Sequence, residues 1–363
     1  MLGTIIVPFT EKVFGDHNYE VLTSSRNGIQ RQSEHFAGKQ RHDTDGYNII
    51  PRGYCTYRNR SDDGLFTFNM NNIVDEGIVS KFYPVFTFQN ANSTFMMEYL
   101  NGSPRVRAKL SVLAVGTSQV VLSFETLKET SFYLPIFEEQ NRIASLLSAL
   151  NARIEKQRLL IEHLKKYKRG VSIAIFDRKI SLTKNSPSWI KTTIGEICKI
   201  TMGQSPDSES YNTDQIGIPL VQGNADMKNR ITCPQRYTSK PTKICEKGSI
   251  ILSVRAPVGS VGRADRTVCL GRGVCAINSD NNDFLYYFFE RNEPYWKRIE
   301  QGGTFTAISG DDIADMPIDY PSLEERQKIA DFLLKIDTHI AAEQNTLDQF
   351  ITLKSGLLQQ LFT

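Results

Sequence analysis

The feature that most constrains this chain is a long segment that occurs twice. Residues 134–177 match residues 320–363 at a constant offset of 186 positions and without a gap. Ten aligned pairs are identical, among them Glu138/Glu324, Ile143/Ile329, Lys168/Lys354 and Phe176/Phe362. A period of this length is too long for a solenoid unit. The chain therefore consists of two related halves, each with a variable block followed by the repeated segment.

The repeated segments are predicted to be long heptad helices, because their apolar residues recur alternately four and three positions apart. The seam positions of the two copies are Ile143, Leu147, Leu150, Ile154, Gln157, Ile161 and Leu164, and Ile329, Leu333, Ile336, Ile340, Glu343, Leu347 and Phe350. Each copy begins after a proline with two glutamates in its first turn, which favours a helix N-terminus. The basic run LKKYKRG favours an end of the first helix near residue 170.

One polar residue interrupts each seam at equivalent positions, Gln157 and Glu343. In an antiparallel pair of equal helices the two midpoints face each other, so these residues could set the register. Alternatively, both side chains point to solvent where the helix twists.

The variable blocks lack long helical periodicity and read as short strands separated by turn residues, as in KGSIILSVRAPVGSVGRA (247–264). With 363 residues and 40% hydrophobic content, the chain can form at least two cores. We expect an α+β fold with two strand-rich domains separated by two long helices, packed as an antiparallel coiled coil with an internal pseudo-two-fold repeat. The expected domains are residues 1–133 and 187–319, and the expected helical spacers are residues 134–180 and 320–363.

Basic residues are concentrated in each variable block, although the net charge is only +3. Residues 26–60 contain seven Lys/Arg against three acids, and residues 224–272 contain ten against three. Arg, Lys, Asn and Gln can hydrogen-bond to base edges in the DNA major groove, and Ser and Thr suit phosphate. The pattern favours duplex recognition, although a solvated basic face would give a similar count.

Two such readers on one rigid spacer would touch two separate half-sites. A helix over residues 138–170 would span roughly 50 Å at 1.5 Å per residue, or about 15 base pairs. The helix would then be duplicated because the reader is duplicated, and the pair would act as a ruler.

Several other classes of protein have little support. The six cysteines form no CxxC pair and the five histidines show no zinc-ligand spacing, so no metal site is expected. No stretch approaches the length of a membrane span and the start lacks a basic signal-peptide region, so we expect a cytoplasmic protein.

The repeated motifs resemble the conserved regions of type I restriction-modification specificity subunits. The resemblance rests on LPIFEEQNRIASLL and YPSLEERQKIADFL, with Gly116-Thr117 and Gly303-Thr304 in their lead-ins. The second block resembles a target recognition domain of this family through Trp189, IGEI, MGQSP, IPLVQGN, KGSIILSVRAPVG and QGGTFTAI. The first block has no counterpart of Trp189 and matches more loosely.

This resemblance implies a non-catalytic subunit that reads a split, asymmetric DNA site. It would dock two modification subunits, which carry S-adenosylmethionine and methylate adenine, and restriction subunits that use ATP and Mg²⁺ would join the complex. The chain itself would hold no cofactor and no metal. Candidate residues for the partner surface are Arg142, Arg153, Lys165, Lys166 and Lys328.

Candidate DNA contacts combine the basic regions with the motifs of the resemblance. In the first block they are Arg26, Arg31, Tyr57, Arg58, Arg60 and Lys81. In the second they are Gln204, Ser205, Gln222, Asn224, Lys228, Arg255, Arg263, Gln301 and Thr304.

Two alternatives remain open. The chain could be a coiled-coil scaffold, or a phage-encoded decoy, that binds modification subunits without reading DNA. Pro206-Asp207 and Asp226-Met227-Lys228 also fit the spacing of a metal-dependent nuclease, in which two carboxylates would hold Mg²⁺.

Overall fold

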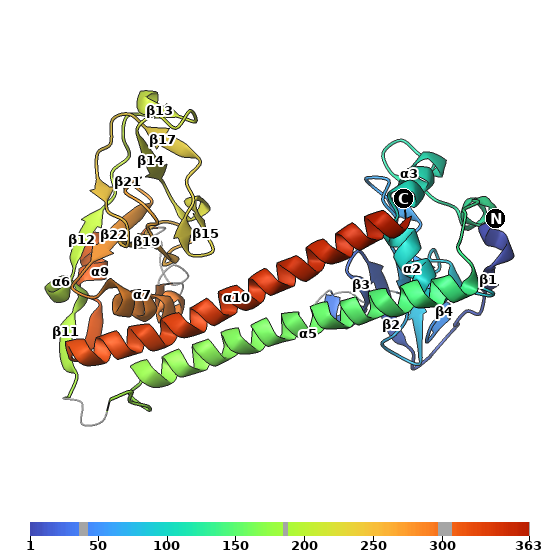
Figure 1. The fold of residues 1–363 in the computed structure, drawn as a ribbon, viewed down its shortest axis with the longest axis horizontal. Coiled ribbons are helices and arrows are strands. Elements are labelled where there is room, and N and C mark those ends of the chain that lie inside the picture. The colour runs from blue at the N-terminus through green and yellow to red at the C-terminus, as the bar shows by residue number, and fades with distance from the viewer. Residues whose placement is uncertain (36–42, 184–187, 297–306, 363) are drawn as a thin grey trace. The chain divides into compact units, whose positions relative to one another are not determined.

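The computed structural model describes residues 1–35, 43–183, 188–296 and 307–362 (Figure 1). The chain divides into two compact units, unit 1 (residues 1–159 and 344–363) and unit 2 (residues 160–343). Each unit contains one variable block and opposite halves of the two long helices. The predicted linear boundaries instead assign each helix as a whole to a spacer.

Unit 1 contains ten short strands and four short helices among its described residues, before the first long helix. The strands are β1 (Ile6–Phe9), β2 (Glu20–Ser25), β3 (Gly28–Arg31), β4 (Asn48–Pro51), β5 (Cys55–Tyr57), β6 (Arg60–Ser61), β7 (Phe68–Met70), β8 (Glu76–Val79), β9 (Val85–Phe88) and β10 (Val120–Val121). The helices are α1 (Gln32–His35), α2 (Ser93–Gly102), α3 (Pro104–Leu113) and α4 (Phe124–Glu129), and the 3-10 turn η1 is Leu2–Thr4.

Unit 2 is also rich in short strands. These are β11 (Ile190–Thr193), β12 (Lys199–Met202), β13 (Tyr211–Asn212), β14 (Ile218–Val221), β15 (Met227–Lys228), β16 (Ile231–Thr232), β17 (Arg236–Thr238), β18 (Ile244–Cys245), β19 (Ile250–Ser253), β20 (Val261–Arg263), β21 (Val268–Leu270), β22 (Val274–Asn278) and β23 (Pro317–Tyr320). The helical elements are α6 (Ile194–Ile197), η2 (Ser208–Ser210), η3 (Asn224–Asp226), α7 (Asn282–Arg291) and α9 (Gly310–Ala314).

The two units share one sheet topology. The order β1-β9-β5-β7 of unit 1 corresponds to β12-β22-β19-β20 in unit 2, and all of these neighbours pair antiparallel. The second sheets correspond as β3-β2-β8-β4 and β17-β14-β21-β18, each with one parallel pair, β2 with β8 and β14 with β21. The strand-rich blocks are therefore two copies of one domain.

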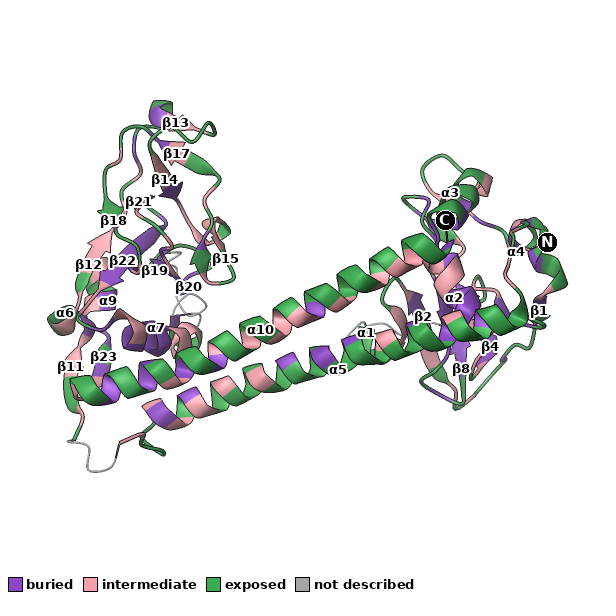
Figure 2. Cartoon of the chain, viewed as in Figure 1, coloured by how far each residue is buried: buried purple, intermediate pink, exposed green. Residues whose placement is uncertain are grey.

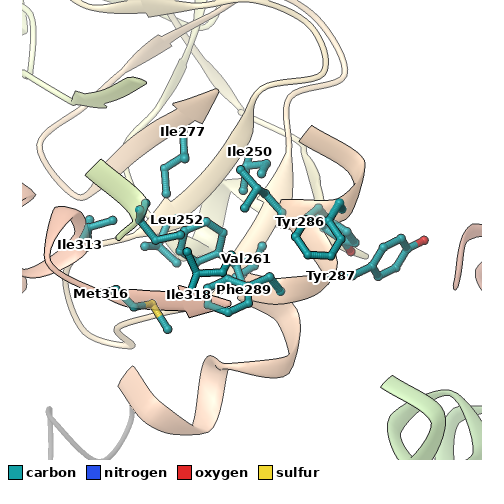
Figure 3. Packing of buried hydrophobic residues seen from close by; sticks show 14 of the residues in the cluster. Ile250, Leu252, Val261, Ile277, Tyr286, Tyr287, Phe289, Ile313, Met316 and Ile318 are labelled. Atoms are coloured by element: carbon teal, nitrogen blue, oxygen red, sulfur yellow. The ribbon is translucent and has the colours of Figure 1, made fainter. Parts of the chain in front are cut away.

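The largest core lies in unit 2 and packs α7 between the sheet and the long helices. Ile250, Leu252 and Ile277 from β19 and β22 meet Phe289 of α7 in this cluster (Figure 3). Strand β19 is buried at all four positions, which explains the apolar run at residues 250–252. In unit 1 the corresponding core joins β5 and β9 to α2 and contains Tyr57.

The long helices are α5 (Phe137–Phe176) and α10 (Leu323–Phe362), each of 40 residues. Every predicted seam position is buried or half-buried, in a stripe flanked by exposed residues (Figure 2). Within unit 1 the start of α5 meets the end of α10, since Leu147 and Phe362 share one cluster. Within unit 2 Ile175 clusters with Ile329. The expected α+β fold with two long antiparallel helices is confirmed.

The two polar seam residues do not point to solvent. Gln157 is 6% exposed, and the Glu343 side chain is 24% exposed with its carboxylate 3.2 Å from His339 Nε2. The solvent-facing alternative is therefore wrong, whereas a role in register stays a prediction.

The predicted end of the first helix near residue 170 is also wrong. Helix α5 continues through Gly170 to Phe176. A Cβ on Gly170 would meet nothing within 4 Å, so this glycine serves no close approach and acts only as a weak helix former. Packing of Val171, Ile175 and Phe176 against the core of unit 2 outweighs that local preference.

A second repeat ties each long helix to its domain, at an offset of 189 rather than 186. Asn92 and Asn281 cap α2 and α7, and their side chains accept hydrogen bonds from the backbone N–H of Phe95 and Phe284. Phe362 packs edge-on against Phe95, and its repeat partner at the end of α5 packs against Phe284. The halves therefore also share this capped helix between the repeated segments.

No helix in the described part of the chain has the length and apolarity needed to cross a membrane.

Candidate nucleic-acid interface

Groove 1 lies in unit 1 where β2 and β5 end. It is a hollow of about 340 Å³, and its lining includes Thr23, Ser25, Arg26, Arg58, Arg60 and Tyr83. The structure thus brings together three of the arginines predicted to contact DNA. The hydroxyls beside them are suited to phosphate oxygens.

One carboxylate holds the turn between β2 and β3 at groove 1. Arg26 lies 2.7 Å from Asp63, which also accepts hydrogen bonds from the Ser61 hydroxyl and the Leu65 backbone N–H. The Ser61 and Leu65 bonds, together with Arg26, lower the pKa of Asp63 to about 2. The site is therefore preorganised at neutral pH, with Arg26 partly neutralised.

Three further cations are more available, since Arg58 and Arg60 line groove 1 and Lys81 shares the Phe82 ring with Arg60. Arg58 is exposed and makes no ion pair with any residue that the structure describes. Arg60 and Lys81 lie 5.7 and 5.8 Å from the ring centroid of Phe82, which is 56% exposed. Guanidinium and ammonium groups held over an aromatic face stay positioned without losing their charge.

Two predicted contacts in the first block lie outside the lining of groove 1. Tyr57 is fully buried in the core, and its hydroxyl donates to the Leu122 carbonyl at 3.0 Å. Burial raises the pKa of this phenol. The Tyr57 prediction is wrong because the aromatic residue supports the sheet beneath the groove. Arg31 pairs with Glu20 and Glu34, with its pKa raised by the Glu20 hydrogen bond.

Groove 2 lies in unit 2 where β14 and β19 end. It is a hollow of about 180 Å³, and its lining includes Ser205, Gln222, Asn224, Arg255, Arg272 and Gly273. Four predicted DNA contacts therefore converge there. Arg272 lines the same hollow but is not among the predicted contacts, and its position between two glycines in a turn was the available signal.

Backbone contacts shape groove 2. Asp226 accepts a hydrogen bond of 2.7 Å from the Gln222 backbone N–H, and Ser205 Oγ accepts one of 3.3 Å from the Arg272 backbone N–H. A Cβ on Gly273 would lie 2.1 Å from the Gln222 carbonyl oxygen. Glycine is therefore required where these two loops touch, and the polar side chains are displayed around that contact.

Three other predicted residues of the second block lie outside groove 2. Gln204 is exposed and its backbone N–H donates to Leu270, and Lys228 is exposed on β15. Arg263 pairs with Asp283 and stacks 4.1 Å from the Tyr286 ring centroid. The Arg263 guanidinium is thus engaged within the domain, and its predicted contact with DNA stays a prediction. Gln301 and Thr304 lie outside the described residues.

The two grooves occupy equivalent places in the repeated domain. Groove 1 includes residues at the end of β2 and just after β2 and β5. Groove 2 includes residues just after β14 and β19, the corresponding strands of the two sheets. Arg58 and Arg255 each follow the central strand of the first sheet. Two basic regions of unrelated sequence thus occupy equivalent positions in the two copies of the domain.

The carboxylates of the nuclease-like pattern have structural roles. Asp207 accepts a hydrogen bond from the Glu209 backbone N–H, and Asp226 closes the Gln222 loop. Within the described residues, no three His, Cys, Asp or Glu side chains are grouped so that they could hold a metal ion.

The predicted partner residues lie on the long helices. Arg142 and Lys328 pair with Glu138 and Glu324 one turn away. The others are exposed, and Arg153 covers the Phe350 ring at 5.5 Å.

Sequence comparisons identify relatives of both halves. The family model for the type I restriction modification DNA specificity domain matches residues 15–163 and 187–352. The putative type I restriction enzyme MjaX specificity subunit of Methanocaldococcus jannaschii is 35% identical over 255 residues, covering 65% of this chain and 59% of that protein. The MjaIX specificity subunit of the same organism is 34% identical over 194 residues, covering 49% and 45%. The matches span about three fifths or less of these relatives' own length.

Solved structures share the whole architecture. A chain described under "Structural basis underlying complex assembly and conformational transition of the type I R-M system" superposes with a TM-score of 0.63 and 25% identity, covering 99% of this chain and 96% of that one. A type I restriction-modification S subunit from M. genitalium has a TM-score of 0.65 at 16% identity, covering 100% and 95%, and supports the fold alone. Because the family model matches most of both halves, the chain belongs to the family of type I restriction-modification specificity subunits.

Proposed function

We propose that this chain reads a bipartite, asymmetric DNA site, with one half-site in groove 1 and the other in groove 2. The observation that carries the proposal is the placement of two unrelated basic sets at equivalent strand ends. Arginine pairs bidentately with guanine and Asn or Gln with adenine in the major groove. Different side chains on one scaffold would give two different half-sites.

The long helices are proposed to dock two modification subunits, one on each copy of the repeat. Exposed apolar residues support this role, since Leu146, Leu160 and Tyr167 recur along α5 at heptad spacing. Arg142, Arg153, Lys166 and Lys328 would surround that surface, whereas Lys165 lines a cavity of unit 2. Restriction subunits would join this complex, and a cytoplasmic location, where the proposed DNA substrate would be met, completes the proposal.

The chain is proposed to be non-catalytic and without a cofactor of its own. S-adenosylmethionine would belong to the modification subunits, and ATP with Mg²⁺ to the restriction subunits. Structural roles of Asp207 and Asp226 support this proposal over a nuclease.

The test maps adenine methylation in DNA from cells that express the chain with its modification subunits. Arg58→Ala should relax one half-site and Arg255→Ala the other, each reducing discrimination by about 1–3 kcal/mol. Arg52→Ala and Lys247→Ala are matched controls, because these residues lie at the opposite ends of β5 and β19 and are exposed. If both groove variants keep the full motif, the grooves do not read bases.

A second variant tests whether the helices set the gap between half-sites. One heptad is inserted after residue 157 and another after residue 343, which lengthens both helices at repeat-equivalent positions. The motif should keep both half-sites while its gap changes. Complex formation without any sequence-specific methylation, in the unmodified chain, would favour the scaffold or decoy.

A further inference from the structure

Unit 2 also contains a cavity that is separate from both grooves. It has a volume of about 570 Å³, within the range typical of ligand sites, and lies between α5, α7 and α10. The charged and hydroxyl side chains that line it include Lys165, Lys168, Arg169, Ser172, Arg230 and Asp337.

The carboxylates of this cavity are already neutralised by the protein. Glu290 and Asp337 each lie 2.7 Å from Lys168 Nζ, and Arg230 binds Glu293 at 2.6 Å and also reaches Glu290. Burial lowers the pKa of Arg230, but hydrogen bonding to Glu293 and the charge of Glu290 outweigh it, so that the net shift is upward. Glu290, Glu293 and Asp337 are thus already paired with Lys168 and Arg230, and none of them pairs with Lys165 or Arg169.

Two cations remain uncompensated. The side chains of Lys165 and Arg169 make no ion pair or hydrogen bond with any residue in the described ranges. The two residues lie one helical turn apart on α5. Ser172, less than one turn further, lies on the same face and lines the cavity as well. An ammonium, a guanidinium and a hydroxyl thus face one hollow from one helix.

The repeat shows that this arrangement is specific to unit 2. Lys168 is matched by Lys354 at the 186-residue offset, but Lys165, Arg169 and Ser172 are matched by Ile351, Ser355 and Leu358. The Ser355 hydroxyl bonds back to the Ile351 carbonyl at 3.0 Å, and Leu358 packs on the core of unit 1. At these three positions α5 has two cations and a hydroxyl, whereas α10 has two apolar residues and a hydroxyl.

We infer that the cavity between α5, α7 and α10 binds one phosphate group per chain through Lys165, Arg169 and Ser172. A phosphate offers several oxygens in different directions, which suits donors of three kinds better than the two oxygens of a carboxylate do. The group could belong to the DNA backbone or to free phosphate. The backbone source rests on the proposed function, whereas the free source does not.

The test uses the full chain in complex with its modification subunits and compares Arg169→Gln with Arg169→Lys. Lys335→Gln is the control, because Lys335 is exposed on α10 outside the cavity and the variant loses the same charge. Thermal unfolding is followed with inorganic phosphate and with sodium chloride at equal ionic strength. DNA affinity is measured across a salt series.

For a DNA phosphate, Arg169→Gln should weaken binding to all sequences alike and reduce the salt slope by about 1. For free phosphate, Arg169→Gln should lose the phosphate-specific rise in Tm. In either case Arg169→Lys should keep most of the effect, and either result supports the site.

The inference is overturned if Arg169→Gln behaves like Lys335→Gln in both measurements. It is also overturned if Arg169→Gln only releases a modification subunit, because the occupant would then be a carboxylate of that partner. A chain that prefers no DNA site would contradict the proposed function, and its Tm response to phosphate would still report on the cavity.

Discussion

The junctions between long helix and domain differ between the two units, although the repeat places the same anchors in both. In each unit the last phenylalanine of a long helix packs on an asparagine-capped helix, Phe362 on α2 and Phe176 on α7. A lysine eight residues earlier adds an ion pair, Lys354 with Glu98 and Lys168 with Glu290. The apolar anchor and the cap are common to both units.

The polar surroundings of the junction are not shared. Gln140 and Arg326 are repeat partners, and both donate to the carbonyl of the proline five residues earlier, at 2.9 and 2.7 Å. Only Arg326 goes on to pair with an acid, Asp280. Similarly, Glu139 is exposed, whereas its partner Glu325 is 2% exposed and accepts a hydrogen bond from Trp189. Apolar packing is therefore conserved between the two repeats, whereas the buried ion pair and the Trp189 hydrogen bond occur at the unit 2 junction.

The largest expected effects come from removing the aromatic anchors. Phe362→Ala should cost about 3 kcal/mol of unfolding free energy, and Phe176→Ala about 2 kcal/mol, because Phe362 is the more deeply buried. Both tryptophans, Trp189 and Trp296, belong to unit 2. Urea unfolding followed by tryptophan fluorescence therefore reports unit 2, while circular dichroism reports both units.

Phe176→Ala should accordingly shift the fluorescence transition, and Phe362→Ala should shift mainly the part seen by circular dichroism alone. Equal shifts of the fluorescence transition by both variants would show that the units unfold as one, and the comparison between them would have no thermodynamic basis.

The next largest effect is expected from removing the lysine ion pair at each junction. Lys168→Met should destabilise unit 2 by about 2 kcal/mol, because the lysine side chain is 11% exposed and its loss leaves two carboxylates without that partner. Lys354→Met should cost unit 1 about 1 kcal/mol, because this lysine is 25% exposed and pairs with one acid. Lys335→Met, on the exposed face of α10, is the control. Equal losses in thermal unfolding would contradict this difference between the junctions.

How far the sequence predicts this molecule depends on the range of the forces involved. The heptads predict both long helices, because a seam is a local pattern and seam burial follows it. The end of α5 could not be predicted locally, because Phe176 is held by α7, more than a hundred residues away. The parallel pairs β2 with β8 and β14 with β21 could not be predicted locally either, because they join strands that are far apart in sequence.

The candidate site shows the same limit. The concentration of basic residues leads to Arg58 and Arg255, which do line the grooves. Residue type alone cannot distinguish Arg255 from Arg263, which stacks on Tyr286 instead of lining groove 2. It also assigns Tyr57 to DNA, although burial decides otherwise. Aligning the chain at the offset of the long helices does not reveal the second repeat, because its offset differs by three residues.

A smaller effect is expected from the caps, which are common to both units. Asn92→Ala and Asn281→Ala should each cost about 1 kcal/mol, because each leaves a helix N-terminal N–H without its acceptor. Asn92→Asp and Asn281→Asp keep the acceptor and should recover most of the loss. The stability of each unit is measured as for the anchors. A cost in one unit only would show that the caps have diverged like the charges.

The smallest effect compares the units through one buried thiol in each. Burial raises the pKa of Cys55 in unit 1 and of Cys275 in unit 2 to about 12. Below pH 9 the thiol is protonated in both the folded and the unfolded state. As pH rises from 9 towards 12 only the unfolded thiol ionises, so that the folded state progressively loses stability. Each thiol should therefore lower the stability of its unit by about 0.8 kcal/mol at pH 9.5 and by almost nothing at pH 7.

Pulsed thiol labelling followed by peptide mass spectrometry measures the opening of each unit separately. Cys233, which is exposed, should react at once and serves as the reference. Cys275 should be labelled more slowly than Cys55 at pH 7 if the charge network makes unit 2 the more stable unit. Cys55→Ala and Cys275→Ala should each reduce the pH dependence of their own unit between pH 8 and 9.5. Faster labelling of Cys275 at neutral pH would reverse the predicted order, and the ion pairs around Lys168 would then serve the geometry of the cavity more than the stability of unit 2.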